Sequence, residues 1–287
     1  MLRVVAFVLC LVWQTPGYRD QVESYRKGRE ARINGVTGAT ALVGLHWLTA
    51  GRHSVGRAAS NEIVLTGPSA PDFLGTIVVT ATGATLNVAP GVTASVGAEH
   101  SSVIALDPAK NTEVAVGGMT LTVIRRAKGL ALRVWDANAP ARVSFHGLSW
   151  YPVDAAWNIS AKWVPHTPAP VVHVLDVLGE VVDMPNPGAA VFSVSHKEYR
   201  LEALVDPDNP GALFFPFRDA TSNRTTYGAG RYFYVSQPKD GRVQLDFNYA
   251  LNPPCAFSEF TTCPVAPAAN RLALAITAGE MYKPAVR

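Results

Sequence analysis

The sequence predicts a mainly β protein with few helices, and three observations carry that prediction. Short apolar segments rich in β-branched residues recur along the chain, Gly, Pro, Asn and Asp separate them, and helical periodicity is confined to one segment near the N-terminus. Hydrophobic residues make up 48% of the 287-residue chain and charged residues 16%, which is ample for a packed core. This length fits two modest domains.

Residues 1–17 predict a signal peptide. Arg3 provides a short positive region, residues 4–13 form an apolar run, and residues 14–17 break it. A helix of that length spans only about half of a bilayer, so a stable membrane anchor is disfavoured. We therefore expect export to the periplasm or out of the cell, with N-terminal anchoring as the alternative. No later segment of the sequence is long and apolar enough to span a membrane.

Residues 18–34 predict a helical lead-in, with a helix over 20–32 and Asp20 placed to cap it. A first β domain is expected over residues 35–145, with strands at 63–65, 76–80, 85–88, 113–116, 119–124 and 130–135. Short strands at this spacing indicate a sandwich or a barrel. Residues 150–170 are rich in proline and aromatic residues, which is typical of a linker or of a strand that crosses between domains.

A second antiparallel β domain is predicted over residues 146–287, with strands at 171–178, 190–195, 198–205, 213–217, 231–236, 242–251 and 271–277. Asp240-Gly241 favours a type I′ turn, because both central residues of that turn need positive φ. A two-residue loop pairs the flanking strands in a hairpin. In that register Arg231, Asp246 and Asn248 share one polar face, and the core face carries Tyr232, Tyr234, Val243, Leu245 and Phe247.

The polar face of this hairpin is the predicted functional site. The planar fork of Arg231 suits a carboxylate or a similar anion, and an aspartate or glutamate nearby can serve as a general base. The predicted ligand-binding residues are Tyr227, Arg231, Asn248 and Asn270, and the predicted catalytic residues are Asp219, Asp246 and Glu280. In the structural interpretation, Arg231 and Asp246 form a buried ion pair and the asparagines hold loop backbone.

Three functions are compatible with these residues. We rank a binding module for a small anionic ligand or peptide first, a hydrolase or lyase second, and a structural envelope protein third. The net charge is only +3 and the chain has no dense block of Lys and Arg, which disfavours nucleic acid as a partner.

Cys255 and Cys263 are the two cysteines that follow the signal segment. Seven residues separate them and prolines flank both, so a disulfide is the favoured interpretation in an oxidising compartment, where it would contribute about 2–3 kcal/mol. Zinc is disfavoured because no histidine lies nearby in the sequence. The chain has neither His-Glu-x-x-His nor Gly-x-Ser-x-Gly, and Gly228-Ala-Gly230 lacks the third glycine of a dinucleotide site. We predict no metal site and no cofactor.

Residues 51–75 contain Gly56-Arg57, Asn61-Glu62-Ile63-Val64-Leu65 and Ser69. This stretch is similar to the forkhead-associated (FHA) domain, a β-sandwich that binds phosphothreonine peptides. The resemblance implies an FHA-like sandwich for residues 35–145. Asp72 stands where the FHA motif has a histidine, and a carboxylate there repels phosphate, so the resemblance extends to the fold and not to phosphopeptide binding.

A longer resemblance covers residues 40–283. It is carried by short motifs that are concentrated in the C-terminal half: Thr226-Tyr-Gly-Ala-Gly-Arg231, Leu245-Asp-Phe-Asn248, Asn252-Pro-Pro-Cys-Ala-Phe257, Cys263-Pro264, Asn270-Arg-Leu272 and Ala278-Gly-Glu280. With these motifs the chain resembles a bacterial and archaeal family of unknown function. The resemblance implies a shared architecture but no reaction.

Overall fold

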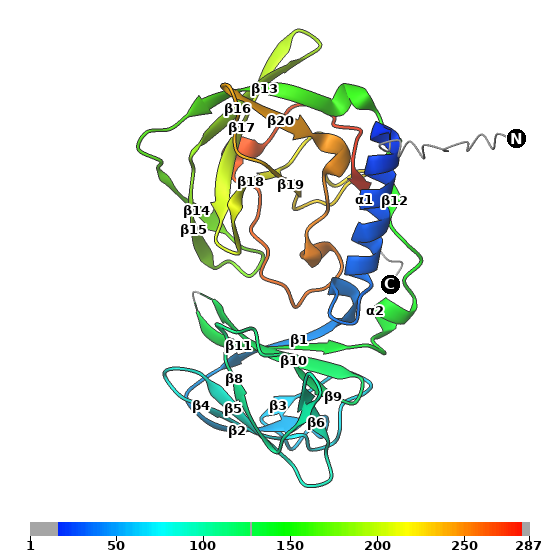
Figure 1. The fold of residues 1–287 in the computed structure, drawn as a ribbon, viewed down its shortest axis with the longest axis vertical. Coiled ribbons are helices and arrows are strands. Elements are labelled where there is room, and N and C mark those ends of the chain that lie inside the picture. Colours follow the sequence, from blue (N-terminus) through cyan, green and yellow to red (C-terminus); the bar gives the residue numbers. More distant parts are fainter. Residues whose placement is uncertain (1–16, 127, 283–287) are drawn as a thin grey trace, which may run out of the picture.

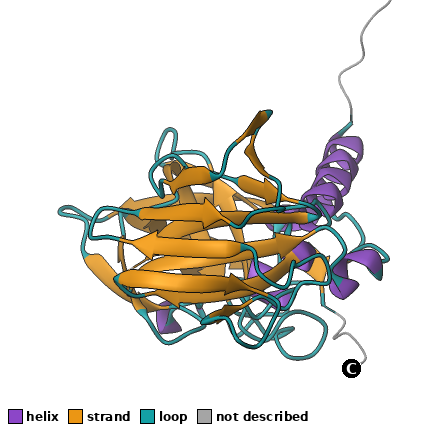
Figure 2. Ribbon diagram, turned by 90° about the horizontal axis from the view of Figure 1, so that it is seen from below, coloured by secondary structure: helices purple, strands orange, loops and turns teal. Residues whose placement is uncertain are grey.

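The computed structural model describes residues 17–126 and 128–282, and Figures 1 and 2 show their arrangement. The described chain is mainly β and its sheets are largely antiparallel, which confirms the predicted fold class. The predicted signal peptide, residues 1–17, lies outside the described residues except for Gly17. None of the described helices is long and apolar enough to cross a membrane.

Helix α1 (Tyr18–Ile33) confirms the predicted N-terminal helix. Gly17 occupies the N-cap position without a side-chain hydrogen bond, so the expectation that Asp20 caps the helix is wrong. Asp20 lies in the first turn instead, where its negative charge interacts favourably with the helix dipole. The buried residues of α1 recur every three or four positions, so they form one stripe: Val22, Arg26, Arg29 and Ile33.

The N-terminal half contains two sheets that enclose one hydrophobic core. The first sheet has the strand order β1 (Leu42–Leu48), β11 (Gly129–Asp136), β10 (Met119–Arg126), β9 (Val114–Val116), β6 (Ala94–Val96) and β7 (Glu99–His100). The second has the order β3 (Ile63–Val64), β2 (Gly51–Gly56), β4 (Gly75–Val79), β5 (Ala84–Val88) and β8 (Val103–Leu106). Both sheets contribute buried aliphatic side chains, including Val55, Ile77, Leu86, Leu121 and Leu132.

Strand β11 is covered on both of its faces. Leu130, Leu132 and Val134 belong to the core between the two sheets. Side chains alternate along a strand, so Arg133 and Trp135 point to the opposite face. That face is turned toward the C-terminal half of the chain (Figure 1), and Trp135 is buried there.

The C-terminal half is built on a curved six-stranded sheet that forms a half-barrel. Its strand order is β19 (Arg231–Val235), β18 (Asn209–Phe217), β17 (Lys197–Asp206), β16 (Gly188–Val194), β13 (Asn158–Pro165) and β20 (Arg242–Asp246). The sheet curls around an aromatic core that includes Phe192, Phe215, Phe217, Phe233 and Phe247. The proline-rich segment expected as a linker or crossing strand therefore contributes an inner strand, β13.

Smaller elements complete the fold. Strands β14 (Val171–Leu175) and β15 (Val181–Pro185) form a hairpin, and β12 (Ser149–Trp150) pairs with β21 (Glu280–Met281). The short helices are α2 (Pro140–Val143) and the 3-10 turns η1 (Ala39–Ala41), η2 (Ala155–Trp157), η3 (Phe247–Tyr249), η4 (Pro254–Ala256) and η5 (Ala268–Asn270). The strand expected at 271–277 does not form, and only an isolated bridge joins Arg271 to Arg218.

The predicted hairpin between residues 231–236 and 242–248 is wrong, although its turn is present. Asp240 and Gly241 have φ angles of 51° and 70°, and Lys239 and Arg242 exchange two backbone hydrogen bonds of 2.9 Å across them. The pairing stops there, at an isolated bridge. Strand β19 pairs with β18 and β20 pairs with β13, at opposite ends of the sheet.

Segments from the two ends of the sequence lie together in the fold. Helix α1 runs along the C-terminal half (Figure 1), where the Tyr18 hydroxyl donates to Asp246 at 2.9 Å. Further along α1, Arg29 Nη2 donates to the carbonyl oxygen of Asn252 at 2.6 Å. The first helix is therefore an integral part of the C-terminal half.

Asp136, at the end of β11, supports a prediction about the N-terminal half. Its buried carboxylate accepts hydrogen bonds from the backbone N–H and hydroxyl of Ser69, both at 2.7 Å, and from the N–H of Asn138 at 2.8 Å. We expect Asp136→Ala to lower the free energy of unfolding by about 2–4 kcal/mol, because buried donors lose their acceptor. Urea denaturation measures this change. Asp107→Ala, which removes an exposed turn carboxylate, is the control, and equal losses in both variants would contradict the prediction.

Candidate functional site

Arg231 does not face a polar surface as the sequence predicted. It lies on the core face of β19 with Phe233, and only 2% of the residue is exposed. Its Nη2 donates to Asp219 at 3.1 Å and to the carbonyl of Ile276 at 2.9 Å, and its Nη1 donates to the carbonyl of Ala278. The guanidinium group therefore fixes the 276–278 segment against β19, and protein groups hold both of its terminal nitrogens.

Asp246 and Asn248 lie in a separate network, at the start of helix α1. Asp246 points to the outer side of β20 and accepts hydrogen bonds from the Tyr18 hydroxyl and the backbone N–H of Asn248. The fully buried Asn248 amide donates to the carbonyl of Asp154 at 2.8 Å. Burial and the Asp246 carboxylate raise the pKa of Tyr18. The prediction that Arg231, Asp246 and Asn248 share one polar face is thus wrong, because it required the β19–β20 hairpin.

Glu280 forms a third network beneath helix α1. This fully buried carboxylate lies 3.4 Å from Arg29 Nε and accepts a hydrogen bond of 2.9 Å from the Asn252 amide. Burial raises the pKa of Glu280 to about 6, and Arg29 and Asn252 oppose that shift. Asp219, Asp246 and Glu280 share no hydrogen-bond partner, so the structure does not bring the three predicted catalytic carboxylates together. Their catalytic roles stay predictions.

The two remaining predicted ligand-binding residues contact the protein itself. Asn270 is fully buried; its amide donates to the carbonyls of Glu202 and Pro216 at 2.9 and 2.8 Å and accepts from the N–H of Glu202 at 2.7 Å. The Tyr227 hydroxyl donates to the carbonyl of Cys255 at 3.1 Å. Asn270 ties its own segment to the backbone of β17 and β18, which agrees with the structural interpretation of the asparagines.

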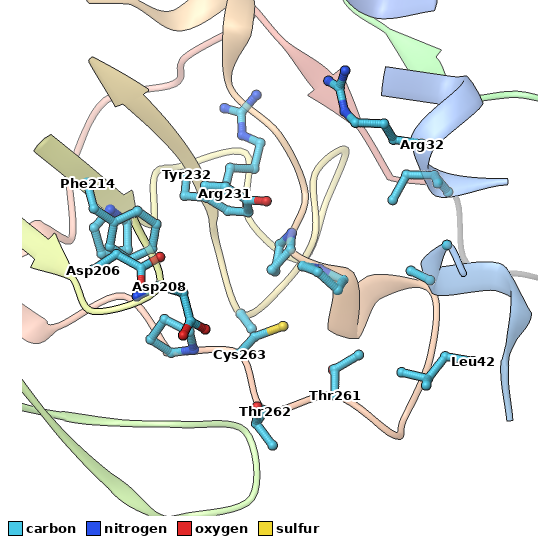
Figure 3. Close-up of a pocket in the computed structure, with 18 of the residues that line it drawn as sticks. Arg32, Leu42, Asp206, Asp208, Phe214, Arg231, Tyr232, Thr261, Thr262 and Cys263 are labelled. Atoms are coloured by element: carbon cyan, nitrogen blue, oxygen red, sulfur yellow. The ribbon is translucent and has the colours of Figure 1, made fainter. Parts of the chain in front are cut away.

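A cavity of about 450 Å³ lies between the outer face of β11 and the C-terminal half, and we call it the arginine cavity. In Figure 3, Asp206, Asp208 and Phe214 line one side, Arg32 and Leu42 line the other, and the loop of Thr261, Thr262 and Cys263 lies below. Further lining residues that matter here are Arg29, Arg126, Arg133, Trp135, Tyr232 and Tyr234. The cavity therefore combines guanidinium groups with aromatic rings.

Arg133 combines a buried position in this cavity with the lack of a partner. Its Nε is buried and without a hydrogen-bond partner, as is the Nε of Arg231, which also lines the cavity. Unlike Arg231, Arg133 makes no hydrogen bond or ion pair with any residue in the described part of the chain. The guanidinium carbon of Arg133 lies 5.8 Å from the centre of the Trp135 ring, a cation–π contact. Burial lowers the pKa of Arg133, and the charge of Arg126 lowers it further. The hydroxyl of Thr122, its cross-strand neighbour on β10, is also buried and unpartnered.

The other charged groups of the cavity are largely balanced. Arg126 donates to Asp208 and to the hydroxyl of Thr262, both at 3.2 Å, and Arg29 is paired with Glu280. Asp206 accepts a hydrogen bond from the Tyr234 hydroxyl. Among the described residues, Arg32 and Arg133 have no carboxylate within ion-pair distance. The cavity therefore has an excess of positive charge that the protein does not neutralise.

The sequence contains one signal for this site, an arginine within an apolar run. Residues 130–135 read Leu-Ala-Leu-Arg-Val-Trp, so Arg133 is the single charged residue in an otherwise apolar strand. A charge in such a strand must either reach solvent or face a polar space between layers. Sequence alone does not show which second layer covers the strand.

Cys255 and Cys263 are both free in the structure, so the predicted disulfide is not formed there. Cys263 Sγ accepts a hydrogen bond from the backbone N–H of Cys255 at 3.3 Å. The contact between the two side chains raises the pKa of Cys255 and lowers the pKa of Cys263. Within residues 17–126 and 128–282, no group of three or more His, Cys, Asp or Glu side chains is placed to hold a metal ion.

Part of the chain matches a protein family whose function is unknown. Residues 143–281 match the model of a family described as "Protein of unknown function (DUF1684)". The chain is also similar to an uncharacterized protein from gene locus rrnAC0354 of Haloarcula marismortui, whose structure was solved by solution NMR. The identity is 31%, the match covers 49% of this chain and 79% of that chain, and the TM-score is 0.41. No curated protein matches the chain.

Glu280 leads to a prediction about pH. Its folded-state pKa of about 6 lies above the ordinary value of 4.5, so between these pH values the folded protein holds a proton that the unfolded chain has lost. This contribution to stability is complete below pH 4.5 and is lost as the pH rises to 6, a fall of about 2 kcal/mol. Urea denaturation at several pH values should show that Glu280→Gln lacks this fall. Parallel pH profiles for the two proteins would contradict the prediction.

Asn270 leads to a prediction about stability. Asn270→Ala removes the partner of three buried backbone groups, so we expect the free energy of unfolding to fall by about 2–4 kcal/mol. Thermal and urea unfolding measure this change. Asn209→Ala, at an exposed turn on the neighbouring strand, should change stability by less than about 0.5 kcal/mol. A stable Asn270→Ala protein would restore the interpretation of Asn270 as a ligand-binding residue.

Proposed function

Since the chain belongs, through residues 143–281, to a family of unknown function, we propose its role from the cavity itself: the protein binds a small anionic ligand in the arginine cavity. This keeps the class of function that ranked first on sequence. Arg231 also lines the cavity, but protein groups hold its terminal nitrogens, so Arg133 is the proposed anion-binding group. The observation that carries the proposal is the Arg133 guanidinium, which lines the cavity with a buried Nε and no hydrogen-bonding or ion-pairing partner among the described residues.

The energetic argument is one of unmet hydrogen-bonding capacity. Arginine carries five N–H donors in a rigid fork, and a carboxylate or phosphate accepts two of them at once. A buried donor without an acceptor costs about 1–3 kcal/mol. An anion beside Arg133 would supply acceptors and would also offset the repulsion between Arg133 and Arg126.

The size and lining of the cavity support a small molecule over a peptide. About 450 Å³ falls within the range of pockets that enclose small ligands. Trp135, Phe214 and Tyr232 add aromatic surface to the charged lining, so the best-suited ligand has an acidic group on a flat apolar body. Burial raises the pKa of Tyr232 to about 12, which keeps its hydroxyl neutral and able to donate.

A neighbouring cavity provides a contrast within the same molecule. It has a volume of about 480 Å³ and shares Arg126, Asp206 and Asp208 with the arginine cavity. Its lining adds the cations Arg125 and Lys128 but also the carboxylates of Asp176, Glu180 and Asp183, so acidic groups outnumber basic ones there. These negative charges oppose an anion there. The excess of positive charge, and with it the proposed binding, is confined to the side that contains Arg133.

The proposal predicts that Arg133→Gln weakens the binding of small acids. Benzoate, citrate and inorganic phosphate serve as probes, with the shift of the thermal unfolding midpoint and calorimetric titration as measurements. Loss of one charge-assisted contact corresponds to an affinity loss of about 10- to 100-fold. Arg52→Gln, at an exposed arginine on β2, is the matched control and should bind as the unmodified protein does. Equal binding by both variants, or no binding of any probe, would refute the proposal.

A further inference from the structure

Cys263 forms part of the wall of the arginine cavity. It lies on the loop that follows η4, and Figure 3 shows its sulfur among the residues that line the space. The residue is only 7% exposed, so small molecules that reach the sulfur approach it through the cavity. A thiol in this position would contact a ligand bound by the arginines of the cavity.

A hydrogen-bond donor and a positive charge lie beside the sulfur of Cys263. The backbone N–H of Cys255 donates to it at 3.3 Å. The guanidinium of Arg133 adds positive charge to the surroundings. Donors and nearby positive charge stabilise a thiolate relative to a thiol, and the thiolate is the nucleophilic form of cysteine.

Cys255 has the opposite environment and serves as an internal reference. It interacts with Cys263 through its thiol, and that contact together with burial raises its pKa. It does not line the arginine cavity. Of the two cysteines in the described chain, only Cys263 therefore combines contact with the cavity and an environment that favours the thiolate.

We infer that Cys263 is a covalent modification site, at which its thiolate attacks small electrophilic carboxylic acids held by the arginine cavity. The inference rests on the proposed anion binding and adds a nucleophile to it. With a halo-acid the sulfur forms a bond to the carbon that carries the halogen, and the carbon–halogen bond breaks. The halide leaves with the electron pair, and the proton of the original thiol goes to solvent.

Two alkylating reagents of similar size distinguish the reactivity of the Cys263 thiolate from the attraction of anions by the arginine cavity. Iodoacetate carries a carboxylate, whereas iodoacetamide is neutral. The full chain is treated with each reagent at pH 7, and peptide mass spectrometry gives the rates at Cys263, Cys255 and Cys10 separately. We expect Cys263 to react at least about tenfold faster than Cys255. We also expect its ratio of iodoacetate to iodoacetamide rates to exceed that of free glutathione by about tenfold, because fixed positive charge concentrates anions.

Variants and a competing anion show which part of the inference each result supports or contradicts. Arg133→Gln should bring the ratio at Cys263 down toward the value for glutathione, Arg52→Gln should leave it unchanged, and citrate should slow the reaction with iodoacetate more than that with iodoacetamide. A Cys263 that reacts no faster than Cys255 while benzoate or citrate still binds overturns the inference and leaves the proposed function standing. A fast Cys263 with the same ratio as glutathione overturns both. Cys255→Ser, which keeps Cys263, tests whether the fast thiol needs its neighbour.

Discussion

The burial of strand β11 on both faces is the constraint on which the rest of the structure depends. One face supplies Leu132 and Val134 to the core of the N-terminal half, and the other presents Arg133 and Trp135 to the C-terminal half. A guanidinium group cannot be packed against an apolar layer without a large cost in solvation. A polar space beside Arg133 resolves that conflict, and the arginine cavity is such a space. Its existence follows from the position of Arg133 on the outer face of a strand whose neighbouring residues are apolar.

Two other buried arginines have hydrogen-bond and ion-pair partners within the protein. Arg231 donates hydrogen bonds to Asp219 and to two carbonyl groups. Arg29 donates to Glu280 and to the carbonyl of Asn252. In such pairs the loss of one partner costs about 3–5 kcal/mol, because the remaining charge is left uncompensated. Arg133 has no comparable set of partners among the described residues. All three arginines line the arginine cavity, but the protein itself supplies partners to Arg29 and Arg231 and leaves the guanidinium of Arg133 free to bind a ligand.

The sequence predicts local features of this protein well and non-local pairing poorly. The N-terminal helix, most of the strands and the turn at Asp240-Gly241 follow from periodicity and turn chemistry, which depend on neighbouring residues. The partners of β19 and β20 do not, because β19 pairs with the strand before it, β18, while β20 pairs with β13, much earlier in the chain. The predicted site failed with that pairing, since the faces of Arg231 and Asp246 depend on register. For the polar residues of the C-terminal motifs the sequence left a functional and a structural interpretation open. The contacts of Asn248 and Asn270 with backbone agree with the structural one, whereas the buried ion-pair partner of Arg231 is Asp219 and not Asp246.

The contacts of helix α1 have a consequence for the order of folding. The helix begins at Tyr18, yet its buried arginine Arg29 is paired with Glu280, 251 residues further along the chain. On the ribosome this helix is completed early and waits, with its inner stripe exposed, until nearly the whole polypeptide has emerged. The docking of α1 onto the C-terminal half is therefore a late event with a large loop-closure cost, although the strands of the half-barrel itself all lie within residues 158–246.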